Sequence, residues 1–137
     1  MDTATRHLVR NRAKGRCEYC GLPEEFVPLI TFHIEHIIPR QHGGDDEPTN
    51  LALSCPWCNW AKGPNLSGID PDTNVLVPLF HPRQHVWSEH FAYQGPRIIG
   101  PSPIGRATVR VLAMNRVEPL EIRAWLMTEG IHFQSCE

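Results

Sequence analysis

The sequence contains two Cys-x-x-Cys pairs, and they restrict the fold of this chain more than any other feature. The pairs are Cys17 with Cys20 and Cys55 with Cys58. Two such pairs can converge on one Zn²⁺ ion as four thiolate ligands, with Zn–S distances of about 2.3 Å. The alternative is two disulfides or buried free thiols. Zinc with four cysteine ligands has no open position for water, so we expect it to be structural. Cys136 is left over, and we expect it to be unligated.

The length and composition predict a single soluble domain over residues 1–137. Hydrophobic residues make up 41% of the 137 residues and charged residues 20%, and no apolar run is long enough to cross a membrane. The first 16 residues are polar and basic, unlike a signal peptide. We therefore expect a cytoplasmic protein with reduced cysteines. Thirteen prolines and ten glycines indicate many turns and favour a metal-stapled fold over a large sheet.

The formal net charge is −2, whereas proteins that bind nucleic acid through its phosphates usually carry a clear excess of positive charge. The charges are nevertheless unevenly distributed. Five basic residues lie near the N-terminus against the single acid Asp2, namely Arg6, Arg10, Arg12, Lys14 and Arg16. This stretch predicts either a basic face for DNA or an ordinary solvated helix face.

Local patterns predict a helix, a hairpin and a second helix in the first half of the chain. Residues 3–14 lack proline and internal glycine and carry a narrow apolar stripe, which indicates a helix ended by Gly15. The pattern predicts a strand over residues 30–35, a long loop over residues 40–49 and a second, antiparallel strand over residues 50–54. Residues 57–62 then form about two turns of helix, because Pro56 suits a helix start and Gly63 a helix end.

The second half of the chain carries weaker signals. Residues 64–72 are rich in turn formers, whereas residues 74–77 predict a strand. We expect a short helix within 82–91 and two short strands within 90–100. Ser102 and Pro103 predict the start of a helix reaching Met114, and Pro119 opens a last helix ending at Gly130. The expected fold class is α+β, with a core over about residues 17–63 and an α/β extension over residues 64–137.

Four polar residues within and beside the hairpin could cut a phosphodiester bond, namely Glu35, His36, Asn50 and Asn59. A carboxylate can hold Mg²⁺ or a similar hard ion while a neutral imidazole removes a proton from the attacking water. Neighbouring strand residues point to opposite faces, so Glu35 and His36 share one site only if the chain bends there. Asn59, just past Cys58, would offer an amide oxygen to the same ion.

Several of these motifs together resemble the HNH endonuclease family, also called His-Me finger nucleases, with its ββα-metal fold. The motifs are Cys17-x-x-Cys20, Glu35-His36-Ile-Ile-Pro39, Gly43-Gly44, Asn50-Leu51, Cys55-x-x-Cys58-Asn59 and Lys62-Gly63. The resemblance implies that His36 is the general base, that Glu35 and Asn59 bind a catalytic Mg²⁺ or Mn²⁺, and that Asn50 orients the base. The sequence departs from the family pattern by having Glu35 in place of the commoner Asp and Asn59 in place of a third His.

The residues and the resemblance together favour a metal-dependent DNA endonuclease with a structural zinc. Arg40 and Lys62 are placed to contact phosphates, although each is as readily a solvated surface charge. The alternative is a non-catalytic zinc-stabilised module that binds nucleic acid or a protein. If a single catalytic site per chain cuts both DNA strands, we expect a homodimer. Partner proteins of a phage or defence system are compatible with both the nuclease and the non-catalytic module.

Overall fold

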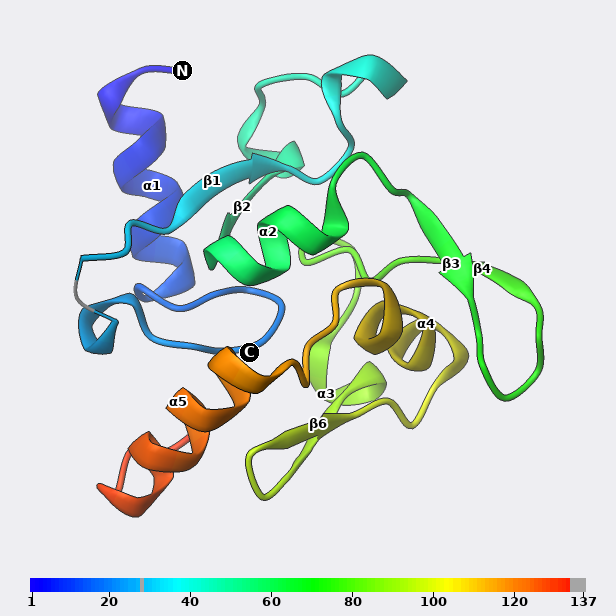
Figure 1. Ribbon diagram of the computed structural model, residues 1–137. Helices are drawn as coiled ribbons and strands as arrows, with labels where there is room; N and C mark the ends of the chain where they lie inside the picture. Colours follow the sequence, from blue (N-terminus) through cyan, green and yellow to red (C-terminus); the bar gives the residue numbers. More distant parts are fainter. Residues whose placement is uncertain (28, 134–137) are drawn as a thin grey trace.

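The computed structural model describes residues 1–27 and 29–133 and shows a mixed α/β fold with small sheets (Figure 1). The predicted α+β class is confirmed at this level. The first helix, α1 (Thr3–Ala13), is capped by Asp2, whose side chain accepts a hydrogen bond of 2.7 Å from the backbone N–H of Thr5. The helix ends one residue earlier than predicted, because Lys14 already adopts a left-handed conformation with φ of 56°.

A hairpin and a short helix follow, in the predicted order. Strands β1 (His33–His36) and β2 (Leu51–Ser54) pair antiparallel, and the register sets Glu35 opposite Ala52. Helix α2 (Pro56–Lys62) starts directly after β2, with Cys55 as its N-cap residue. The strand predicted over residues 30–35 starts three residues late, because among residues 1–27 and 29–133 the pairing with β2 begins only at His33. The long loop between the strands contains two single-turn helices, η2 (Arg40–His42) and η3 (Pro48–Asn50), while η1 (Glu24–Phe26) precedes β1.

The described residues after α2, up to residue 133, form two further hairpins and three helices. They are β3 (Ser67–Ile69), β4 (Leu76–Pro78), α3 (Trp87–His90), β5 (Ala92–Gln94), β6 (Arg97–Ile99), α4 (Pro103–Val111) and α5 (Val117–Thr128). Strand β3 lies within residues 64–72, for which the sequence predicted only turns. Its three residues include a glycine and pair with β4, so the hairpin partner and not the local sequence defines the strand.

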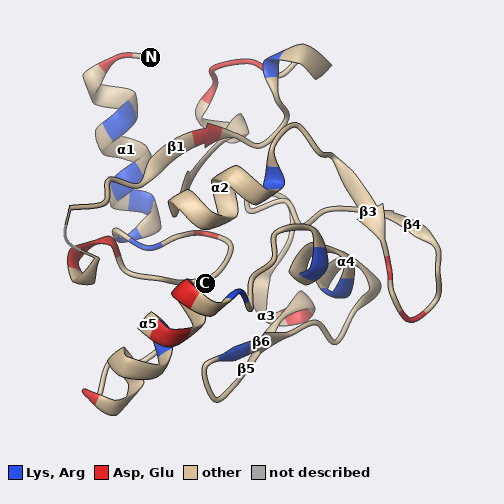
Figure 2. Ribbon diagram, viewed as in Figure 1, with Lys and Arg blue, Asp and Glu red and all other residues tan. Residues whose placement is uncertain are grey.

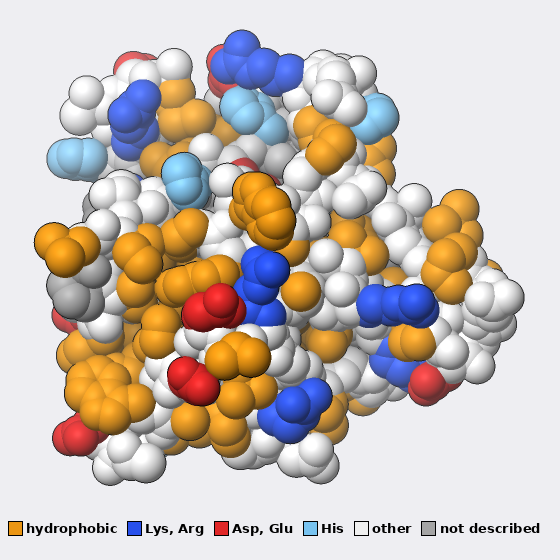
Figure 3. Space-filling view, in the orientation of Figure 1, with side chains coloured by type: hydrophobic (Ala, Val, Ile, Leu, Met, Phe, Trp, Pro, Cys, Tyr) orange, Lys and Arg blue, Asp and Glu red, His pale blue; other side chains and the backbone are white. Residues whose placement is uncertain are grey.

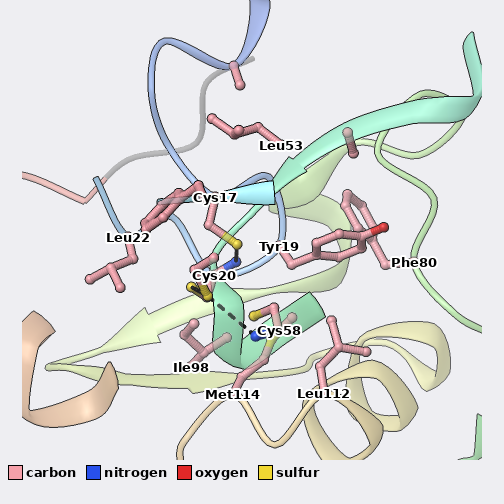
Figure 4. Packing of buried hydrophobic residues seen from close by; sticks show 14 of the residues in the cluster. Cys17, Tyr19, Cys20, Leu22, Leu53, Cys58, Phe80, Ile98, Leu112 and Met114 are labelled. Atoms are coloured by element: carbon pink, nitrogen blue, oxygen red, sulfur yellow. Dashed lines mark hydrogen bonds between the residues drawn. The ribbon is translucent and has the colours of Figure 1, made fainter. Parts of the chain in front are cut away.

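One buried hydrophobic cluster joins the hairpin region to the later elements. Figure 4 shows Tyr19 beside Phe80, and Ile98, Leu112 and Met114 packing near the cysteines. Tyr19 is fully buried, and its ring meets that of Phe80 edge-on at 6.4 Å between centroids. Apolar burial therefore fixes the cysteine loop and the extension against each other.

Among the described residues, no helix combines the length and the apolar character that spanning a bilayer requires.

Candidate functional site

The four cysteines of the two predicted pairs converge, as predicted, on one point beneath the hairpin. Their Sγ atoms all lie within 4.8 Å of one another, and all four residues are buried. Cys20 Sγ and Cys55 Sγ are 3.7 Å apart, far longer than a disulfide bond of about 2.05 Å. Four thiolates around zinc would be separated by about 3.8 Å, given Zn–S distances of about 2.3 Å. The cluster fits a tetrahedral zinc ion.

Backbone N–H groups point at two of these sulfurs. The N–H of Cys20 lies 3.5 Å from Cys17 Sγ, and the N–H of Cys58 lies 3.4 Å from Cys55 Sγ. Such hydrogen bonds favour the thiolate form that metal binding requires. Figure 4 shows the sulfurs of Cys17, Cys20 and Cys58 facing one another across the gap between the cysteine loop and α2. Cys136, expected to be unligated, lies outside the described residues.

Glu35 faces the interior between β1 and α2. It is 8% exposed, accepts a hydrogen bond from the Tyr19 hydroxyl, and has one carboxylate oxygen 3.7 Å from Lys62 Nζ. Burial raises the pKa of Glu35 to about 7, although the charge of Lys62 and the bond from Tyr19 act in the opposite direction. The predicted metal ligand is thus a buried carboxylate that already has a cationic partner.

Lys62, predicted from sequence to contact a phosphate or to be a solvated surface charge, is buried and engaged within the protein. Lys62 is 2% exposed, and its Nζ donates a hydrogen bond of 2.9 Å to the carbonyl oxygen of Ile37. The ammonium group is held between this carbonyl and the carboxylate of Glu35. A lysine at the end of a short helix looks like a surface charge in sequence, whereas tertiary packing closes over it here.

His36 points away from Glu35 and contacts an acid that the sequence analysis did not single out. Its Nε2 lies 2.6 Å from Asp46 Oδ1. Arg40 donates two hydrogen bonds to the same carboxylate, at 2.8 and 3.1 Å. The bond to His36 and the charge of Arg40 hold the pKa of Asp46 below its usual range. Arg40 and Asp46 are exposed, so this group, which we call the His36–Asp46–Arg40 cluster, faces solvent.

Asn50 holds the loop that brings Asp46 to His36. Its side-chain oxygen accepts a hydrogen bond of 2.8 Å from the N–H of Ile38, and its amide nitrogen donates to the carbonyls of Ile38 and Asp45 at 3.0 and 2.9 Å. Gly44 packs against the backbone of Ile38 so closely that a side chain there would clash, because an added Cβ would lie only 1.6 Å from the Ile38 carbonyl oxygen. Asn50, predicted to orient the base, thus contacts the loop backbone and, within the described residues, makes no hydrogen bond to the imidazole of His36.

Asn59 lies on α2, one turn before Lys62, and is partly buried. Within the described chain its side chain makes no hydrogen bond. The structure thus brings together two polar groups, one around Glu35 and Lys62 and the other around His36 and Asp46. Residues 35 and 36 are neighbours in a strand and have different partners, so the groups lie on opposite faces of β1.

Most of the N-terminal basic residues bind the protein itself. Arg10 pairs with Glu24, and Arg12 donates to the carbonyl oxygens of Pro48 and Leu51 at 3.1 and 2.8 Å. Figure 2 shows the Lys and Arg positions along α1 beside this hairpin. These contacts attach α1 to the hairpin, so only part of the stretch is available to a ligand.

Histidine side chains gather on one part of the surface. On the face drawn in Figure 3 they lie over α1, β1 and the η2 loop, whereas Lys and Arg side chains are spread across the face and hydrophobic side chains gather over α5. A surface hollow of about 300 Å³ lies in this region and is lined by residues that include Arg6, Arg10 and His33.

The comparisons with curated proteins and with solved structures gave no match. Residues 17–65 match the family model described as HNH endonuclease, which confirms for this segment the resemblance predicted from its motifs.

Proposed function

We propose that this protein is a metal-dependent DNA endonuclease in which His36 is the general base. The observation that supports this most directly is the position of His36. It lies at the end of β1, inside the segment that matches the HNH family, and its imidazole is paired with a carboxylate on an exposed face. A histidine held by a carboxylate is a common arrangement for a general base.

The pairing with Asp46 selects the nitrogen that can accept a proton. An ionised carboxylate only accepts hydrogen bonds, so His36 Nε2 carries the hydrogen and Nδ1 keeps the free lone pair. Nδ1 would remove a proton from the water that attacks phosphorus. The negative charge of Asp46 then stabilises the imidazolium that forms. Asn50 maintains this geometry by fixing the loop between Ile38 and Asp45.

The residues around Lys62 fit a catalytic Mg²⁺ or Mn²⁺ by the chemistry of their donors. The carboxylate of Glu35 and the carbonyl of Ile37 are hard oxygen ligands, and both already face a positive charge, the ammonium of Lys62. We propose that Glu35 and Asn59 hold the divalent cation and that Lys62 withdraws when it binds. The bound ion would stabilise negative charge on the phosphate and the leaving oxygen. Because Glu35 and His36 lie on opposite faces of β1, the ion and the base act on the same phosphate only if the strand bends at this point.

DNA contact would involve Arg40 and the hollow beside β1. Arg40 is 68% exposed at its side chain and lies next to the base, so one of its N–H groups can reach a phosphate. Arg6 and His33 line the hollow on the side of α1. We further propose a cytoplasmic location, because thiolate ligands persist in a reducing compartment, and a homodimer if both DNA strands are cut.

The proposal is tested by incubating supercoiled plasmid with the zinc-loaded protein and Mg²⁺ or Mn²⁺. We expect nicking by the wild type and a loss of at least about 100-fold in His36→Ala, the usual effect of removing a general base. His42→Ala is the matched control, since His42 lies exposed in the same loop. Absence of nicking by the wild type, or equal nicking by His36→Ala, would refute the nuclease.

The burial of Glu35 supports one other function, a non-catalytic zinc-stabilised module that binds nucleic acid or a protein. In that case the Glu35–Lys62 pair is purely structural and never opens. Such a module would bind DNA, or a partner protein of a phage or defence system, without cutting. It would bind DNA equally well with and without Mg²⁺ and would leave plasmid supercoiled.

A further inference from the structure

A cavity of about 270 Å³ lies between the HNH segment and the extension. Its floor is buried and is formed by residues from both parts, among them Ile37, Leu79 and Phe80. The polar side chains of Asn65 and Gln84 stand at its rim and are exposed. The cavity therefore has an apolar base and a polar edge, the usual character of a pocket for a small organic group.

The cavity lies close to the proposed base along the chain. Ile37 and Ile38, which line it, follow His36 directly. Lys62 also lines it, but its ammonium is engaged by the carbonyl of Ile37 and the carboxylate of Glu35. The positive charge of Lys62 is thus compensated before any ligand enters.

Two histidines complete the wall, and their hydrogen bonds define which nitrogen each presents. His85 Nδ1 accepts a bond of 2.9 Å from the N–H of His81, and His81 Nδ1 accepts one of 3.1 Å from the N–H of Arg83. Burial lowers the pKa of both imidazoles, and a neighbouring histidine lowers each further. Near neutral pH each ring is therefore uncharged and carries its hydrogen on Nε2 as a donor.

We propose that this cavity binds an unpaired nucleobase of the DNA strand being cut. A flat heterocycle suits the small volume and the apolar floor, and its edge would meet the amides of Asn65 and Gln84 and the Nε2–H donors of His81 and His85. A phosphate is a poorer occupant, because the cavity offers no uncompensated positive charge. This inference rests on the proposed function and adds a substrate class, DNA that contains unpaired nucleotides.

A base must leave the helical stack to enter the cavity, and this is easiest for a base that has no partner. The test uses His36→Ala protein, so that binding is measured without cleavage. The probes are a short duplex with one unpaired 2-aminopurine and the same duplex fully paired. We expect the unpaired probe to bind about tenfold more tightly, which is the effect of one base–side-chain stacking contact, with a change in 2-aminopurine fluorescence.

Filling the cavity provides the matched variants. Leu66→Trp places an indole at the lining, whereas Leu76→Trp adds the same group on β4, outside the lining, where Leu76 is 64% exposed. Leu66→Trp should abolish the tenfold preference and leave binding of the paired duplex unchanged, and Leu76→Trp should alter neither. Gln84→Ala, at an exposed rim position, should reduce the preference without a change of fold.

The inference is overturned if the two probes bind equally, if neither binds, or if Leu66→Trp and Leu76→Trp weaken both probes alike. Its failure is distinguishable from that of the nuclease. Plasmid nicking without preference for unpaired bases would reject the base pocket alone. Tight, Leu66-dependent binding of the unpaired probe without nicking by the wild type would reject catalysis alone.

Discussion

At the residue scale, the partner of His36 decides how the base works. Asp46 is the only acid among the described residues that contacts the imidazole, and it also binds Arg40. Asp46→Asn should lower the rate of plasmid nicking at saturating DNA by at least about tenfold, because an amide no longer fixes the tautomer or stabilises the imidazolium. The rate is compared at saturating DNA because Asp46→Asn also changes the charge beside Arg40, the proposed phosphate contact.

Glu47→Gln is the control for this change. It removes one negative charge from the adjacent position, where the carboxylate makes no ion pair within the described chain. Equal losses of rate in Asp46→Asn and Glu47→Gln would show that only the local charge matters and that Asp46 has no positioning role.

Lys62 is the second residue whose role the structure redefines. Lys62→Met leaves Glu35 buried without its cation, so the free energy of unfolding should fall by about 3 kcal/mol, the lower end for breaking a buried pair. We use the lower end of that range because the Glu35 carboxyl, with a pKa of about 7, can bind a proton and become neutral when the ammonium of Lys62 is absent.

Mn²⁺ should then raise the melting temperature of Lys62→Met more than that of the wild type, since the ion no longer competes with an ammonium group. Thermal unfolding with and without Mn²⁺ measures this, and Lys14→Met at an exposed position is the control. A shift no greater in Lys62→Met than in the wild type would contradict a divalent site at Glu35.

At the scale of elements, a buried ion pair attaches the β3–β4 hairpin to α4. Asp70 is fully buried and accepts two hydrogen bonds of 2.8 Å from Arg106, and it also accepts bonds from Asp72 and Thr73. The bonds from Arg106 are the main reason that the pKa of Asp70 lies well below its usual range. The hairpin is thereby held on the helix by a carboxylate that must stay ionised.

Acid should release this attachment. Because the pKa of Asp70 is lower in the folded chain than in the unfolded chain, its contribution to stability is present above about pH 4 and is lost as the pH falls below the unfolded value. Urea unfolding between pH 6 and pH 2 should show a steeper acid loss for the wild type than for Asp70→Asn. Glu118→Gln, with an exposed carboxylate, should follow the wild type. Parallel curves for the wild type and Asp70→Asn would refute this role.

At the scale of the whole molecule, the cysteine cluster joins the loop before the hairpin to the helix after it. Structural zinc sites contribute about 10 to 16 kcal/mol of apparent binding free energy, comparable with the whole stability of a domain of about 5 to 15 kcal/mol. We therefore expect one zinc ion per chain by metal analysis. Removing it with a chelator should unfold the helices, as measured by far-ultraviolet circular dichroism.

Added Zn²⁺ should restore the helical signal, whereas Mg²⁺ should not, because thiolates prefer the softer ion. Protein that retains its helical signal after complete removal of zinc would show that the apolar cluster alone holds the fold.

The parts of the site that could be predicted from sequence are those defined by local spacing. The two cysteine pairs, the hairpin after His33 and the capped helices all follow from residues that lie within a few positions of one another. The roles of Glu35, His36, Asn50 and Asn59 as a catalytic set stay predictions, because a sequence motif does not state what each side chain contacts.

Tertiary structure decided which charges meet. Lys62 was expected at the surface and is buried against Glu35, and Arg12 binds the hairpin backbone. Asp46 and His36 are ten positions apart in the sequence, and they come into contact because the hydrogen bond from Asn50 to the Asp45 carbonyl holds the loop in place. The sequence alone determined where this chain can bind zinc and turn, since thiolate spacing and turn residues act locally. Only the folded chain decided the partners of each charge, because the free energy of a buried charge depends on every group packed around it.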